Sequence, residues 1–376
     1  MNDSLTYRPW LFWLTVVVTL MCLLMIAAGG MVTSMDAGDA VPDWPLSYGS
    51  LMPPMVGNVF WEHGHRLVGM ALGLATIILT VTFARTEPRK WVRTLGYIAL
   101  PAVCFQGLLG GFRVKLISSP WVQEKIFADP TGANVETFRV GLMMVHTTLA
   151  QCVLCLFAVI ALVTSRHWLM ATEGNFCRAC GYDLRGATKR SDGSDAPCPE
   201  CGLAGTGTPV PKQMSKVPKL ALVTAITVVI QLLLGALRRH TDGTIIFHAV
   251  GAFVVAVHIL ALSRKILVHC AQCRVMVRMA VVLLVALALQ LGLGLGSWLL
   301  TSAAIEANQA PRIAGSPEWA SALISAHVAI GAIMLSGCVL LIVEGRRVVS
   351  GSKGGTSHPA DAISGGGSDR GGVVTA

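Results

Sequence analysis

The sequence has little charge and few aromatic rings. Only 13% of its 376 residues are charged and 6% are aromatic, whereas 53% are hydrophobic. Soluble domains of ordinary composition carry about 25% charged residues, so the chain is excluded from that class. Carboxylates are almost absent from the hydrophobic runs, apart from Glu62. Their scarcity argues against a proton relay, because such relays use chains of intramembrane acidic side chains.

Hydrophobic runs of nearly bilayer-spanning length recur through the chain. Because lipid offers no partners for backbone N–H and C=O groups, each run is expected to be an α-helix. The sequence therefore predicts an all-α membrane protein with eight transmembrane helices. We place them at about 10–31, 64–84, 94–112, 140–165, 218–237, 245–263, 279–301 and 320–343.

The basic residues gather on one side of this predicted topology. With the N-terminus in the cytoplasm, most of the 29 Lys and Arg residues fall in cytoplasmic segments, as the positive-inside rule requires. This distribution accounts for the net charge of +9 without a nucleic-acid partner. It predicts a multi-pass protein of a bacterial-type plasma (inner) membrane, with a lipid bilayer as its surroundings.

Four predicted helices carry a histidine soon after their outer end: His65, His146, His248 and His327. Single intramembrane histidines often belong to ordinary packing, and we interpret His258 in that way. Four at comparable depth, on alternating helices, favour cofactor sites built from facing helices. Heme iron accepts an imidazole from either side, so pairing His65 with His146 and His248 with His327 gives two heme-sized sites.

Glu62 lies three residues before His65, at the outer end of the same predicted helix. Residues three apart share a helix face, and charged groups in this position are usually functional. Arg66 is either a cofactor-binding cation or a plain helix-end charge. The preceding loop, up to Trp61, is rich in Gly and Pro, and we expect it to form a folded cap rather than a site.

A glutamine followed by glycine recurs in the third, fifth and seventh predicted helices, at Gln106, Gln231 and Gln290. We interpret these residues as helix-packing positions, because small side chains allow close approach and Gln can bond across helices. The recurrence predicts two pseudo-symmetric four-helix bundles. The predicted divisions are an N-terminal half (1–165), an insertion (166–217), a C-terminal half (218–343) and a disordered tail (344–376).

The polar insertion contains two CxxC pairs with the spacing of a four-thiolate zinc ribbon. The ligands would be Cys177, Cys180, Cys198 and Cys201, holding one structural zinc ion on the cytoplasmic side. A reducing cytoplasm favours thiolates over disulfides. A further pair, Cys270 and Cys273, stands alone and is only a weak indication of a metal or redox role.

These motifs resemble the heme A synthase family over nearly all of the eight-helix body. The most specific elements are Gly29-Gly30-Met31-Val32-Thr33 with Val41-Pro42-Asp43-Trp44-Pro45-Leu46, and Glu62-His63-Gly64-His65-Arg66-Leu67. The resemblance implies oxidation of a ring methyl of heme O to the formyl group of heme A, for use in terminal cytochrome oxidase.

By that resemblance, His65 and His146 face the substrate heme O, and His248 and His327 ligate a heme b cofactor. Glu62 would assist catalysis. The charge of Arg66 suits a heme propionate, and a plain helix-end charge remains the alternative. The chain departs from the family in two places: Val41 and Ser47 stand where many bacterial members carry a Cys pair, and the zinc ribbon is extra.

Other functions remain open at this point. A b-type cytochrome would bind heme but only pass electrons, and a membrane scaffold or transporter would bind no heme. The resemblance implies heme O synthase or the cytochrome oxidase assembly machinery as partners. A homo-oligomer is compatible with the sequence, which carries no motif for a particular electron donor.

Overall fold

Helices account for most of the residues that the computed structural model describes. It describes residues 7–117, 119–127, 133–172, 177, 182, 184, 198–200, 212–240, 245–306 and 318–351, and none of these residues belongs to a β-strand. The long helices are α1 (Pro9–Ser34), α2 (Asn58–Thr86), α3 (Lys90–Ile117), α5 (Ala133–Thr164), α7 (Val217–His240), α8 (Ile245–His269), α9 (Arg274–Glu306) and α10 (Glu318–Gly351). The short ones are α4 (Pro120–Val122), η1 (Gln123–Phe127), α6 (Arg166–Thr172) and η2 (Met214–Lys216).

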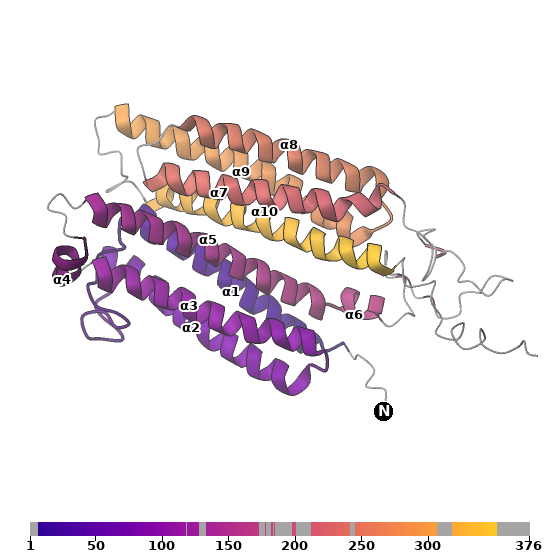
Figure 1. Cartoon of the computed structure of the whole chain (residues 1–376), viewed down its shortest axis with the longest axis horizontal. Coiled ribbons are helices and arrows are strands. Elements are labelled where there is room, and N and C mark those ends of the chain that lie inside the picture. The colour runs from indigo at the N-terminus through magenta and orange to yellow at the C-terminus, as the bar shows by residue number, and fades with distance from the viewer. Residues whose placement is uncertain are drawn as a thin grey trace, which may run out of the picture.

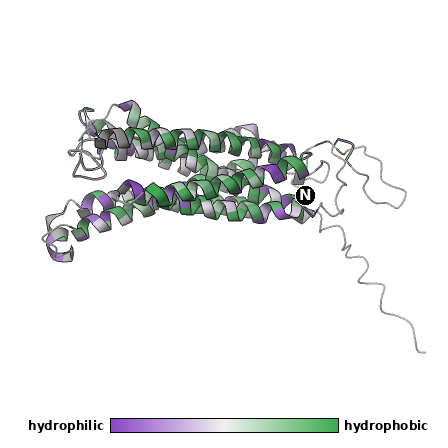
Figure 2. Ribbon diagram, turned by 90° about the horizontal axis from the view of Figure 1, so that it is seen from above, coloured by the Kyte–Doolittle hydropathy of each residue, from purple (hydrophilic) through white to green (hydrophobic). Residues whose placement is uncertain are grey.

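Eight helices of the described chain are long and apolar enough to cross a membrane, which confirms the predicted number of spans. Figure 2 shows their central stretches predominantly hydrophobic and their ends more polar. Large apolar side chains also point outward, for example Leu74 (60% exposed) and Phe253 (70% exposed). A soluble monomer rarely exposes so much apolar surface. The chain is a multi-pass membrane protein.

The long helices form two groups that lie side by side (Figure 1). In the first group α1 contacts α2 and α5, and α3 contacts α2 and α5. In the second group α7 contacts α8 and α10, and α9 contacts α8 and α10. Each group is therefore a closed ring of four helices around its own buried cluster of apolar side chains.

The two groups meet along α1 and α5 of the first and α7 and α10 of the second. Small side chains allow close approach here: a Cβ added at Gly30 of α1 would lie 3.0 Å from the Ser325 side chain of α10. Arg239 of α7 donates from Nη2 to Ser34 Oγ of α1, at 2.6 Å. Hydrogen bonds of this kind hold membrane helices together where no hydrophobic force between them exists.

The helices extend beyond the hydrophobic runs from which they were predicted. The largest correction concerns α10, which continues to Gly351, although the sequence predicted a disordered tail from residue 344. Glu344 explains the extension: its carboxylate is 1% exposed and pairs with Arg347 of the same helix. His167 of α6 also contacts it, with Nε2 3.0 Å from Oε1. This cluster ties the end of α10 to α6, the short helix that follows α5.

Candidate functional site

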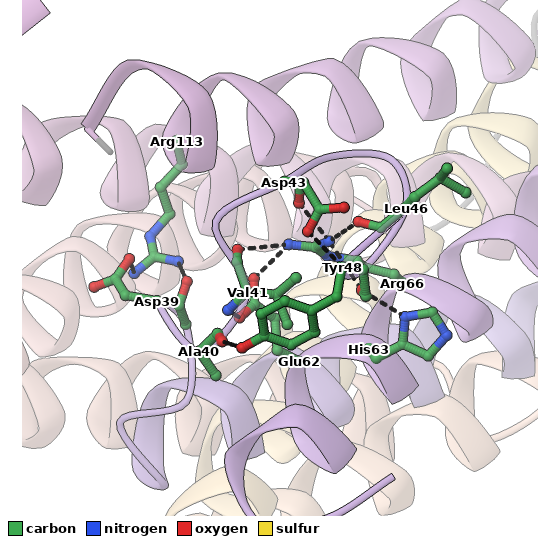
Figure 3. Close-up of polar contacts among 12 residues, drawn as sticks. Asp39, Ala40, Val41, Asp43, Leu46, Tyr48, Glu62, His63, Arg66 and Arg113 are labelled. Carbon is green, nitrogen blue, oxygen red and sulfur yellow. Dashed lines mark hydrogen bonds and ion pairs between the residues drawn. The ribbon is translucent and has the colours of Figure 1, made fainter. Parts of the chain in front are cut away.

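The α1–α2 loop (residues 35–57) folds over the start of α2, held by Arg66 (Figure 3). The guanidinium Nη1 donates to the carbonyl oxygens of Asp43 and Leu46, both at 2.7 Å, and Nη2 donates to that of Val41 at 3.3 Å. The rigid donor fork of arginine suits several acceptors at once. The loop is a folded cap, as the sequence predicted.

Glu62 supplies the countercharge for Arg66. Its Oε1 accepts from Arg66 Nη2 at 2.6 Å, and its Oε2 accepts from the Val41 backbone N–H at 2.8 Å. The residue is only 4% exposed. Both carboxylate oxygens are thus used to fasten the cap, and no hydrogen bond joins Glu62 to His65 in this described part of the chain.

Two further contacts complete the cap. Ser47 Oγ lies 2.7 Å from His63 Nδ1, and His63 Nε2 lies 3.0 Å from the Leu51 carbonyl oxygen. Because a carbonyl only accepts, Nε2 must carry the proton and Nδ1 must accept from the Ser47 hydroxyl. His63 therefore has a structural role in the cap and is not available as a ligand.

Asp43 closes a tight turn within the cap. Its two carboxylate oxygens accept from the backbone N–H groups of Tyr48 and Gly49, at 2.7 and 2.8 Å. The bond from Gly49, supported by that from Tyr48, lowers the pKa of Asp43 below its usual value, because both favour the charged carboxylate. The turn is thus stabilised by an ionised side chain.

The cap also reaches the third helix. Arg113 of α3 donates from Nη1 to the Gly38 carbonyl oxygen, and its Nη2 lies 3.2 Å from Asp39 Oδ1 (Figure 3). Trp44 packs on Gly111, where an added Cβ would fall 2.6 Å from the indole ring. The cap therefore positions Arg113 next to the histidines described below.

The structure brings the four predicted histidines together as two pairs. His248 of α8 and His327 of α10 have ring centroids 6.3 Å apart, with their planes at 69°. His65 of α2 and His146 of α5 lie near enough for their rings to interact electrostatically. Each pair joins two helices of one group, which is the pairing that the sequence predicted.

A glycine on the preceding long helix adjoins each histidine ring. A Cβ added at Gly29 would lie 3.1 Å from His65 Cε1, and one at Gly294 would lie 3.0 Å from His327 Cε1. The same holds for Gly235 with His248, at 2.9 Å, and more loosely for Gly110 with His146, at 3.8 Å. These glycines give the imidazoles room on the helix-facing side.

The chemistry of the two pairs suits a metal-centred cofactor with anionic groups. The Nδ1 atoms of His65, His146 and His327 are buried without a hydrogen-bond partner, which is costly unless a bound group completes the site. Arg113 acts electrostatically on both His65 and His146, while Arg238 and Arg239 act on His248 and His327 respectively. The Nε atoms of Arg113 and Arg238 are also buried without partners.

Other predicted site residues have different surroundings. Arg66 donates to the cap and to Glu62, so its contact with a propionate stays a prediction. His258 lies outside both pairs and its Nδ1 is 2.9 Å from the Val254 carbonyl oxygen of its own helix. The glutamines bond across helices, as the sequence predicted, and their partners are the histidines. Only their recurrence in the sequence pointed to them.

The predicted zinc ligands are only partly covered. Cys177 and Cys198 are buried, whereas Cys180 and Cys201 lie outside the described residues. Within the described ranges, no group of three or more His, Cys, Asp or Glu side chains is arranged to hold a metal ion. Cys177 and Cys198 belong to the same buried cluster as Cys270 and Cys273.

Comparison with known proteins agrees with this geometry. The model of the cytochrome oxidase assembly protein family matches residues 55–180. The chain is similar to heme A synthases. It is 36% identical to that of Exiguobacterium sp. over 97 residues, and 35% identical to that of Symbiobacterium thermophilum over 98 residues. These matches cover 25% and 26% of this chain, and 32% of each relative.

A longer and weaker match is the heme A synthase of Pelagibacter ubique, 25% identical over 182 residues, covering 38% of this chain and 47% of the relative. The chain spans about a third of the length of each of the first two relatives. The family match includes Glu62, His65, Arg66 and His146, but not the His248–His327 pair. The comparisons thus show a similarity to heme A synthases over part of the chain.

Proposed function

We propose that this protein is a heme A synthase, which oxidises a ring methyl of heme O to the formyl group of heme A. The observation that carries the proposal is the pair of His65 and His146, with its unpartnered Nδ1 atoms, inside the segment that matches the family. The second pair, outside that segment, repeats the arrangement. The two rings of four helices support a duplicated, pseudo-symmetric architecture with one cofactor site in each half.

In this proposal His248 and His327 ligate a resident heme b, and His65 and His146 bind the substrate heme O. When bound, the heme iron supplies the oxidising chemistry. Arg113 and Arg238 are placed to pair with propionate groups, because guanidinium–carboxylate pairs are strong and directional. Their buried Nε atoms would gain acceptors in the process.

The cap and Glu62 control the environment of the first pair. The folded α1–α2 loop is fastened to the start of α2, one turn from His65, through Glu62 and Arg66. Glu62 would hold or move a proton beside the reacting methyl group, as a positioned carboxylate can. Its present bonds to Arg66 and Val41 mean that this role requires the cap to shift or to relay the proton.

The proposed orientation follows from the charge distribution. The start of α1 and helix α6 lie at one end of the bundle, and the α1–α2 loop lies at the other (Figure 1). The positive-inside rule assigns the first end to the cytoplasm. The cap and the histidine pairs then lie toward the outer face of a bacterial-type plasma membrane.

We also propose that the insertion binds one structural zinc ion through Cys177, Cys180, Cys198 and Cys201. The spacing of these cysteines supports the site, as does the bond from Cys177 N–H to the Tyr182 carbonyl oxygen, at 2.8 Å. Glu200 forms an ion pair with Arg274 at the start of α9. This contact would dock the insertion on the C-terminal half.

The optical spectrum and heme content of the purified protein test the proposal. Expression together with a heme O synthase should yield bound heme b with the spectrum of two axial imidazoles, and heme A among the extracted hemes. Bound heme without any heme A would favour a b-type cytochrome that only passes electrons. Protein without heme would contradict both functions.

A further inference from the structure

Three glutamines contact the histidine of the following long helix. Gln106 Nε2 donates to the His146 carbonyl oxygen at 3.1 Å, and Gln231 Nε2 donates to that of His248 at 2.9 Å. Gln290 Nε2 lies 3.2 Å from His327 Nε2. Each glutamine stands one helical turn before the glycine beside that histidine. Gln231 Nε2 also lies 3.0 Å from His248 Nδ1. The amides of Gln231 and Gln290 therefore contact the imidazole rings, and that of Gln106 contacts the backbone of His146.

The corresponding position in α1 is a methionine. Met25 stands one turn before Gly29, which adjoins His65. The Met25 methyl group would lie 3.1 Å from a Cβ added at Gly69, one turn after His65. In the second group, the Gln290 amide lies in the same way against Gly331, one turn after His327, at 3.4 Å. Met25 thus takes the place that glutamine has beside the other histidines.

The unpartnered atoms in these spaces are chemically complementary. The Oε1 atoms of Gln106, Gln231 and Gln290 are buried without a donor. The Nδ1 atoms of His146 and His327 are buried without a partner as well. A histidine that ligates through Nε2 carries its proton on Nδ1 and normally donates it to a neighbouring acceptor. The amide nitrogen faces the ring in Gln231 and Gln290, so each glutamine must turn its amide oxygen toward Nδ1 to act as this acceptor when a heme is bound.

His65 lacks such an acceptor. Its Nδ1 is also buried without a partner, but the neighbouring thioether of Met25 is only a weak acceptor. A histidine without a second-shell partner is a less basic ligand and is less firmly oriented. The four histidines are therefore not equivalent, although their glycine neighbours are alike.

We propose that Gln106, Gln231 and Gln290 are positioning residues that fix His146, His248 and His327 as cofactor ligands. Met25 then leaves His65 as the exchangeable ligand, the one that releases a heme most readily. The inference rests on the proposed function. It assigns tight retention of the resident heme to the C-terminal pair, where both histidines have a glutamine. It assigns release of a heme to the N-terminal pair, where one histidine has none.

Release of heme to excess apomyoglobin tests the positioning role, with heme b and heme O counted separately by chromatography. Gln231→Leu and Gln290→Leu should each release heme b roughly 10–100-fold faster than wild type, the usual cost of losing a second-shell partner. Their heme b midpoint potentials should rise, because the axial imidazole becomes less basic. Gln290→Glu should retain heme b and shift the potential the other way.

Gln151→Leu is the matched control. Gln151 is a buried glutamine of α5 whose Oε1 also has no partner, and it contacts none of the four histidines by a hydrogen bond within the described chain. It should release heme b at the wild-type rate with the wild-type potential. A purely structural effect of glutamine loss would appear in this variant too.

Met25→Gln tests the exchangeable ligand by a gain of function. Supplying the missing acceptor should slow release of heme O roughly 10-fold or more, with heme b release unchanged. Unchanged heme O release would overturn the assignment of His65. Wild-type release and potential in both Gln231→Leu and Gln290→Leu would overturn the positioning role while the proposed function stands. Wild-type protein without any heme would overturn the function and this inference together.

Discussion

The Glu62 carboxylate accepts a hydrogen bond at 2.8 Å from the backbone N–H of Val41, 21 residues earlier in the chain. This bond fastens the cap to α2 at the same side chain to which the family resemblance assigns a catalytic role. Loss of Glu62 would therefore affect heme A formation either by loosening the cap or by removing a catalytic group. Two variants distinguish these roles.

Glu62→Gln should lower heme A formation by roughly 10²–10⁴-fold if the carboxylate acts as an acid or base. It should also loosen the cap, because Arg66 loses its countercharge and the amide has one acceptor oxygen instead of two. Ser47→Ala provides the comparison, since it removes the contact with His63 and leaves Glu62 intact. Heme A analysis and limited proteolysis of residues 35–57 measure the two effects. Equal loss of heme A in both variants would show that Glu62 acts only through the cap.

Acid should open the turn around Asp43. Its pKa is lowered in the folded protein, so its contribution to stability is fully present above the unfolded value of about 4. That contribution is lost as the pH falls further, through the folded pKa. Hydrogen exchange of the peptide with Tyr48 and Gly49, corrected for intrinsic pH dependence, should show this loss. Asp43→Asn should be less protected at neutral pH and should lack the acid step.

Gly294→Ala should weaken binding of the resident heme. The added methyl group would lie 3.0 Å from His327 Cε1, so the imidazole must move from its position, and an affinity loss of about 10-fold or more is expected. Gly292→Ala is a control on the same helix, because a Cβ there meets nothing within 4 Å. Heme b content per chain decides the comparison. Equal heme content in both variants would show that heme binding does not depend on Gly294.

The zinc ribbon makes a separate prediction. Replacing Cys177, Cys180, Cys198 and Cys201 together by Ser should remove one zinc ion per chain, measured by metal analysis of the purified protein. Heme b content should stay unchanged, because Cys177 and Cys198 cluster with Cys270 just after the end of α8, whereas His248 lies near the start of that helix. The double variant Cys270→Ser with Cys273→Ser should keep its zinc. Zinc that persists in the fourfold variant would show that these four cysteines do not bind it.

Much of the fold could be predicted because lipid imposes helices on long apolar runs. The eight spans and the pairing of the histidines followed from hydropathy and from depth. Helix ends were predicted less well, since polar residues such as Glu344 extend α10 through contacts distant in sequence. Hydropathy carries no information on such pairs.

The candidate site was predictable in its residue types but not in its contacts. The Glu62–Arg66 spacing was visible, but the acceptors of Arg66 lie 20 to 25 residues away in an irregular loop. The glutamines were noticed for their recurrence and were interpreted as packing residues. Only the three-dimensional arrangement shows that each one contacts a histidine and that Met25 breaks the pattern.

The assignment of the two halves has its own test. His248→Ala or His327→Ala should strip the resident heme b, because either change removes an axial ligand. His65→Ala or His146→Ala should leave most of the heme b in place and abolish heme A formation. Heme b retained by purified His248→Ala and His327→Ala would show that the halves are assigned wrongly.

The most direct test of the central claim is chromatography of the hemes extracted from cells that make heme O synthase, with and without this protein. Cells with the synthase alone should contain heme O and no heme A. Adding the wild-type chain should convert heme O to heme A, and adding His65→Ala should not. Heme O that remains unconverted beside folded, heme-containing wild-type protein would contradict a heme A synthase.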